Sequence, residues 1–247
     1  MRGRELSQRF GALFKANLML GAFLVGCTYI LGLPLFSGST LPLKLSVFWV
    51  VAAMIGQIVA WRADGGRGRL FLYGIFNVLG ACSLYLFVAG ISWVFYFSSA
   101  SMPFEVRFIC IAVAVAGTIL WGVLIGRRVS AVLNKPDFLA HVFKDAGNEI
   151  EYRLPGIQQV NAYADARGLG EQFCLGLVLL AAPAVFLASR VVIPFPASRD
   201  LLLFVALLLC PASQLFMGII VKAYLLMIRL PLRLERARGK PVILIDE

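Results

Sequence analysis

Six long apolar runs constrain this chain more than any other feature of its sequence. A window of about 19 residues places them at residues 16–36, 45–61, 70–97, 108–126, 172–194 and 201–228. Each run is near or above the roughly 17–25 residues that a helix needs to cross the hydrocarbon core of a bilayer. Because the runs are continuously apolar rather than alternating, they do not fit the strands of a closed barrel. The sequence therefore predicts an all-α polytopic membrane protein with a bundle of six transmembrane helices.

The composition agrees with this class. The 247 residues are 60% hydrophobic and 15% charged, whereas soluble domains are about 45–50% apolar and 25% charged. Such a chain has too little polar surface to cover its core in water, which excludes a soluble globular protein and a disordered chain. We expect one integral membrane domain over residues 1–247, with a 45-residue loop (127–171) between helices 4 and 5 and a basic tail (229–247) outside the bilayer.

The net charge of +10 indicates orientation rather than nucleic-acid binding. Of the 23 basic residues, 18 lie in the N-terminal segment, the loop after the second run, the 127–171 loop and the tail. Cytoplasmic loops carry an excess of Lys and Arg, so both termini are predicted to be cytoplasmic. Arginines outnumber lysines 17 to 6, which favours a bacterial inner membrane. The arginines expected to contact anionic lipid headgroups are Arg2, Arg4, Arg9, Arg67, Arg69, Arg233, Arg236 and Arg238.

The 127–171 loop is expected to contain short elements that pack beneath the bundle or dock a partner. Asn134 followed by Lys135 and Pro136 is typical of a helix start, and the apolar residues after it form a stripe that Gly147 can end. An extended stretch at 149–155 and a second helix at 157–168 follow. Forty-five residues rarely form an independent core, so the loop is expected to need support from elsewhere.

The two terminal segments each leave two interpretations open. Leu6, Phe10, Leu13 and Phe14 recur at helical spacing, which fits an amphipathic helix on an anionic membrane surface or a basic flank that only fixes orientation. The tail runs from basic residues at 229–240 into a β-branched end. That end fits a strand added to a partner's sheet edge or a mobile terminus.

Residues suited to catalysis are scarce, so we expect no enzyme, no metal and no cofactor. His141 is the one histidine, no phosphate-binding P-loop is present, and no aspartate or glutamate lies within a predicted span. The five cysteines fall in five different spans and resemble small buried hydrophobic residues. Residues 24–27 resemble a bacterial lipobox around Cys27, but the apolar 28–36 stretch departs from that pattern. Residues 65–69 are glycine-rich and basic, which favours a headgroup-contacting turn over phosphate capture.

Two groups of residues inside the bundle carry hypotheses about function. Small residues at successive fours in the fourth run favour close helix packing or a subunit contact: Ala114, Thr118, Gly122 and Gly126. Two prolines predict kinks at similar depth in the last two runs, and neighbouring polar residues form a possible mid-membrane site at Pro183, Arg190, Pro211, Ser213 and Gln214. Lys222 also falls inside a span, where snorkelling to headgroups accounts for it.

These features favour a non-catalytic integral membrane subunit or scaffold of a larger complex, of the secretion, conjugation, defence or envelope type. Its expected partners are anionic membrane lipids and other protein subunits or further copies of itself, and not nucleic acid. The alternative is a small transporter or channel with a site near the proline-kinked helices 5 and 6. A lipid-acting membrane enzyme is the third hypothesis.

Overall fold

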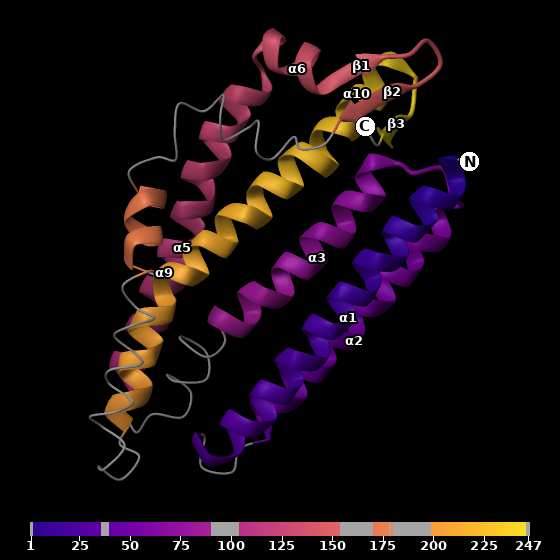
Figure 1. Ribbon diagram of the computed structural model, residues 1–247. Coiled ribbons are helices and arrows are strands. Elements are labelled where there is room, and N and C mark those ends of the chain that lie inside the picture. Colours follow the sequence, from indigo (N-terminus) through magenta and orange to yellow (C-terminus); the bar gives the residue numbers. More distant parts are fainter. Residues whose placement is uncertain are drawn as a thin grey trace.

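The computed structural model describes residues 2–35, 40–89, 104–153, 170–177, 179 and 199–245 (Figure 1). Its helices are α1 (Arg2–Leu35), α2 (Leu41–Asp64), α3 (Leu70–Ala89), α5 (Phe104–Leu133), α6 (Pro136–Val142), α9 (Arg199–Ala223), the π-helix η2 (Tyr224–Arg229) and α10 (Leu230–Arg238). Residues 170–177 are also helical. The strands are β1 (Phe143–Asp145), β2 (Ile150–Arg153) and β3 (Val242–Ile245).

Five helices are long and apolar enough to cross a membrane, which confirms the predicted class of helical membrane protein. Their candidate spans are Phe10–Ile30, Leu43–Asp64, Leu70–Ala89, Phe104–Leu133 and Leu209–Arg238. Many of their large apolar side chains are exposed, including Val113 and Ile119 of α5, as expected of faces that contact lipid. The predicted fifth span lies outside the described residues except for 172–177 and 179, so six crossings stay a prediction.

Helix α3 lies at the centre of the described bundle, with α1 and α2 on one side and α9 and η2 on the other (Figure 1). Two of its glycines allow close approach. A Cβ on Gly74 would lie 2.7 Å from Met227 Cβ and 2.8 Å from Met227 O, so η2 packs directly on the α3 backbone. At Gly80 the space is filled by the amide of Asn17, whose Nδ2 donates to the carbonyl of Phe76 at 3.3 Å.

The N-terminal segment is part of one continuous 34-residue helix and is not a separate surface helix. Phe10 is 1% exposed, and its ring makes edge-to-face contacts with Tyr73 at 5.8 Å and Phe76 at 5.2 Å. These contacts bury Phe10 against the start of α3, and an aromatic ring buried in this way contributes strongly to packing. Of the predicted apolar face, Phe10, Leu13 and Phe14 therefore pack within the protein.

The polar end of the bundle carries a small folded unit, here called the cap, made of α6, β1, β2, α10 and β3. Its sheet has the order β1-β2-β3, with β1 and β2 antiparallel and β2 and β3 parallel. Helix α6 begins at Pro136, where the sequence indicates a helix start. The tail strand β3 thus pairs inside its own chain, whereas the sequence analysis considered only a partner's sheet or a mobile terminus.

Among the described residues, the cap shares its core with the bundle. One buried cluster contains residues of the cap, such as Phe138, Tyr152 and Val242, together with Val129 of α5 and Leu226 of η2. Helix α5 therefore continues seven residues past the predicted end of its span, because its last two turns cover the cap. The loop that is too short to fold alone is completed by α5, η2 and the tail. Both ends of the chain lie at this end of the bundle (Figure 1).

Candidate functional site

A buried ion pair lies between residues 170–177 and α9. Lys222 Nζ is 2.8 Å from Glu171 Oε1, and the two side chains are 13% and 9% exposed. From the sequence, Glu171 is the last residue of the 127–171 loop and Lys222 is accounted for by snorkelling, whereas the structure pairs the two side chains. Removing two charges from water is costly, so each charge at this depth depends on its partner.

A second set of polar contacts lies beside this pair, between α5 and α9. Trp121 Nε1 donates to the carbonyl oxygen of Gln214 at 2.9 Å, and Gln214 Nε2 donates to Thr118 Oγ1 at 3.2 Å. Gly218 joins the two sets, because a Cβ there would lie 3.6 Å from Glu171 Oε1 and 3.8 Å from Trp121 Nε1. We call these six residues the α5–α9 polar cluster: Thr118, Trp121, Glu171, Gln214, Gly218 and Lys222.

One atom of the polar cluster lacks a described hydrogen bond. Gln214 Oε1 is buried and has no hydrogen-bond partner within the described part of the chain. An unpaired buried carbonyl costs about 1–3 kcal/mol. The cluster therefore retains one acceptor that can receive a further donor.

The small-residue face of α5 packs against α9 of the same chain. Thr118 bonds Gln214, a Cβ on Gly122 would lie 3.3 Å from Met217 Cε, and one on Gly126 would lie 3.8 Å from Val221 Cγ1. Ala114, one turn earlier, is half-buried. This face lets α5 and α9 approach closely enough for the polar cluster to form.

The proposed mid-membrane site is described only in part. Pro211 lies inside α9, and Ser213 is fully buried with its hydroxyl donating to the carbonyl of Cys210 at 2.7 Å. Pro183 and Arg190 lie outside the described residues. The structure thus places Gln214 and Ser213 on one helix, with Gln214 turned towards α5.

The glycine-rich turn between α2 and α3 is organised around Asp64, which is 1% exposed. Its carboxylate accepts the backbone N–H of Gly68 at 2.9 Å and that of Arg69 at 2.8 Å. Gly65, Gly66 and Gly68 have φ of 56°, 79° and 70°, a conformation that glycine adopts most easily. Because these two N–H groups already donate to Asp64, they are not free to bind a phosphate.

The same turn holds the tail strand. Leu244 N donates to the carbonyl of Gly68 at 2.9 Å, and Arg69 forms an isolated antiparallel bridge with Ile243. Arg67 is exposed and Arg69 half-buried. Of the other arginines expected at headgroups, Arg233, Arg236 and Arg238 are exposed on α10, while Arg2, Arg4 and Arg9 lie at the start of α1.

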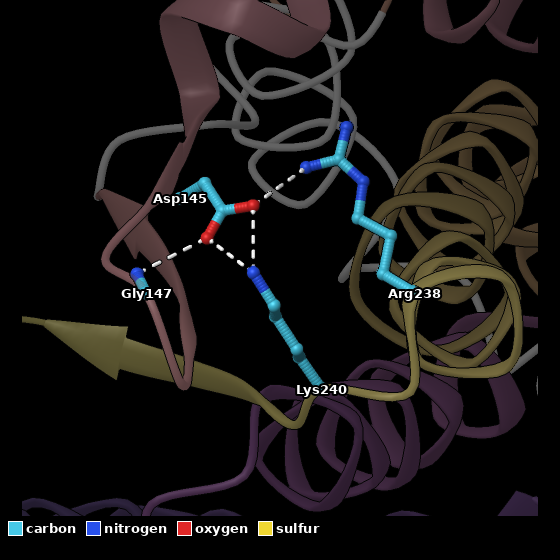
Figure 2. A network of polar contacts seen from close by, with 4 residues as sticks. All are labelled: Asp145, Gly147, Arg238 and Lys240. Carbon is cyan, nitrogen blue, oxygen red and sulfur yellow. Dashed lines mark hydrogen bonds and ion pairs between the residues drawn. The ribbon is translucent and has the colours of Figure 1, made fainter.

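An exposed charge network ties β1 to the tail (Figure 2). Lys240 Nζ donates to Asp145 Oδ1 at 2.9 Å and Oδ2 at 3.1 Å, Gly147 N donates to Oδ1 at 3.1 Å, and Arg238 lies 3.6 Å from Oδ2. The hydrogen bond from Lys240, aided by Gly147 and the nearby positive charges, holds the pKa of Asp145 below its ordinary value. The carboxylate is therefore ionised at neutral pH and joins the ends of the sheet.

Within the described ranges, no group of three or more His, Cys, Asp or Glu residues is placed to hold a metal ion. Comparison of the chain with protein-family models, with curated proteins and with solved structures gives no match. The architecture alone therefore defines the class, a mostly helical membrane protein with a small cap that contains a β-sheet.

Sequence reasoning missed Asp64, Trp121, Glu171 and Lys222 as residues that organise the structure. A signal for the ion pair was present, because Glu171 directly precedes one predicted span and Lys222 lies near the same end of the next. Antiparallel neighbours place such residues at similar depth. No comparable signal marked Trp121, whose partner is a backbone carbonyl.

Proposed function

We propose that the chain is a non-catalytic integral membrane subunit or scaffold, in which the bundle holds the cap rigidly at the cytoplasmic surface for a partner protein. The observation that carries this proposal is the single core shared by cap and bundle, in which Val129 and Leu226 pack with Phe138, Tyr152 and Val242. A loop that only linked two spans would not need to be built into the bundle in this way.

The outer surface of the cap is suited to a polar partner. Ala140 of α6 and Lys144 of β1 are exposed, and β1 pairs with β2 on one side only among the described strands. Docking onto a surface that is already ordered avoids the entropic cost of ordering a loop on binding. We place this surface and both termini in the cytoplasm, on the bacterial inner membrane, with anionic lipids around the basic end of the bundle. The assembly belongs to a secretion, conjugation, defence or envelope system.

Site-specific photo-crosslinking in cells tests this role. A benzoylphenylalanine at Ala140 or at Lys144 is expected to give a protein adduct, which mass spectrometry then identifies. An adduct at twice the mass of the chain identifies self-association. The matched control is the same residue at Ile119, which is 60% exposed on α5 and faces the lipid in our proposal. Adducts at Ile119 alone, or at none of the three positions in a correctly inserted protein, contradict the docking role.

A second candidate function, a small transporter or channel, is favoured by the α5–α9 polar cluster. Paired charges beside a buried acceptor such as Gln214 Oε1 occur in ion and substrate pathways. The test is flux of Na⁺, K⁺ and H⁺ in proteoliposomes, compared between the parent protein, Lys222→Met and the exposed control Arg62→Gln. Transport requires a flux that Lys222→Met abolishes and Arg62→Gln retains. Absence of flux in the parent protein rejects this candidate.

A further inference from the structure

A cleft of about 260 Å³ lies between the end of α5 and the α9–η2–α10 helix. It is lined by Ser130, Leu133, Asn134, Leu225, Arg229, Leu230 and Arg233. The volume is below the roughly 300–1,000 Å³ of sites for drug-sized molecules. The cleft therefore suits a small polar group and not a whole lipid or a peptide.

The polar lining residues present donors from two directions. Arg229 and Arg233 are four residues apart on one continuous helix. Ser130 lies in the last turn of α5, and Asn134 directly follows the helix, with its backbone N–H donating to the carbonyl of Ser130 at 3.2 Å. Residues at this spacing lie on the same face of a helix. Guanidinium groups bind phosphate oxygens through paired hydrogen bonds, and hydroxyl and amide groups can complete the ring of donors.

The two arginines repel each other without a counter-charge, yet no acidic residue of the described ranges lines the cleft. Neither Arg229 nor Arg233 forms an ion pair with any residue that the structure describes. The carboxylate of Glu235, the acid of α10, accepts the backbone N–H of Val242 at 2.9 Å. Like charges at this spacing are destabilising, so an anion in the cleft would relieve them.

The apolar runs of the sequence predict that the cleft lies at the depth of lipid headgroups. Ser130 follows the predicted end of the fourth span by four residues, or about 6 Å of helix, and Arg229 follows the predicted end of the sixth span directly. The headgroup layer on each side of a bilayer is about 5–8 Å thick. Leu133, Leu225 and Leu230 are buried beside the arginines and give the cleft one apolar wall, which suits the glycerol end of a phospholipid.

We propose that this cleft binds a phosphate group, supplied by an anionic phospholipid of the surrounding leaflet. Arg229 and Arg233 bind the phosphate oxygens, Ser130 and Asn134 hydrogen-bond the rest of the headgroup, and the leucines contact the glycerol carbons. This site rests on the lipid contact included in the proposed function, and it is independent of the docking role because it depends on the bundle end and not on a protein partner. Free phosphate is the other source of the same chemistry, and the experiment separates the two.

Native mass spectrometry of the full chain in mild detergent, titrated with phosphatidylglycerol, tests the proposal. The double variant Arg229→Gln/Arg233→Gln is expected to bind phosphatidylglycerol about tenfold or more weakly than the parent protein. The control Arg62→Gln/Arg128→Gln removes two exposed arginines outside the cleft that are not expected at headgroups, and its affinity is expected to stay within about twofold. Equal affinities for the two double variants overturn the proposal.

Two further measurements separate a built site from general charge, and lipid from free phosphate. Ser130→Leu keeps every charge but fills the cleft, so it is expected to weaken binding. If Ser130→Leu elutes from size-exclusion chromatography as the parent protein does and binds the lipid equally well, the proposed site is overturned. The second measurement adds 10 mM inorganic phosphate. Free phosphate is identified as a ligand if it displaces the lipid and raises the Tm of the parent protein but not that of Arg229→Gln/Arg233→Gln. Retention of the lipid in phosphate identifies the lipid headgroup.

Discussion

The carboxylate of Glu171 and the ammonium of Lys222 lie 2.8 Å apart at side-chain exposures of 9% and 13%. Because each charge offsets the desolvation of the other, we expect the single variants Glu171→Gln and Lys222→Gln each to lower the free energy of unfolding by about 3–5 kcal/mol. The double variant is expected to lose less than the sum of the two. The measurement is a double-mutant cycle in detergent, and strictly additive losses would show that the pair is not coupled.

Gly74 is expected to be the least replaceable glycine of the described bundle. A Cβ there meets both the Cβ and the carbonyl oxygen of Met227 within 2.8 Å, and backbone cannot yield as a flexible side chain can. Gly74→Ala should therefore destabilise the protein by about 1–3 kcal/mol. Gly117 of α5 has no atom within 4 Å of its built Cβ, so Gly117→Ala should stabilise by up to about 1 kcal/mol. Thermal unfolding of the two variants compares them, and a Tm for Gly74→Ala at or above that of the parent contradicts the close packing.

Asp64 is expected to control the tail strand, although it lies at the end of α2. Asp64→Ala leaves the N–H groups of Gly68 and Arg69 without their acceptor, at about 1–3 kcal/mol for each buried group. Because Gly68 O accepts from Leu244, hydrogen exchange should become faster at residues 242–245 as well as at 68 and 69. Asp137→Ala, an exposed change in α6, is the control. Exchange that speeds up only in the turn would show that the turn and the strand are independent.

The charge network at Asp145 predicts a sensitivity to acid and to salt. Because the pKa of Asp145 is lowered in the folded protein, the stabilisation is complete above the ordinary pKa. It is lost as the pH falls from about 4 through the lower folded value. The Tm of the parent protein should exceed that of Asp145→Asn slightly at pH 7, by an amount that falls as the pH is lowered below about 4 and that shrinks in 1 M NaCl. A Tm difference that persists at low pH, or that Asp137→Asn reproduces, would show that the contacts of Asp145 do not cause it.

The helices could be predicted from the sequence because their signals are local. Apolar runs located the described spans, and Asn134 followed by Lys135 and Pro136 indicated a helix start, which the structure places at Pro136. The end of α5 could not be predicted in the same way, since Val129 and Leu133 follow two arginines and only their burial in the cap explains the extra turns. Arg127 and Arg128 correctly indicated the limit of the apolar run, but not the limit of the helix.

The sheet and the polar cluster could not be derived from local patterns. β3 pairs in parallel with β2, although α9 and α10 lie between the two strands in the sequence. Such long-range pairing leaves no periodic signal in either segment. Phe10 shows the related difficulty, because an apolar helical face fits a membrane surface as well as it fits the side of α3. The small-residue face of α5 indicated a close contact, but the structure was needed to identify α9 as its neighbour.

The parallel pairing of β2 with β3 also has a consequence for the order of synthesis. β2 leaves the ribosome before α9 exists, whereas β3 follows α9 and can join the sheet only after that helix has been made. Until then, Ile150, Tyr152 and the cap side of α5 lack part of their cover. Closure of the cap is thus coupled to integration of the last described helix, so an incompletely inserted chain displays an open apolar sheet edge that chaperones and proteases can recognise.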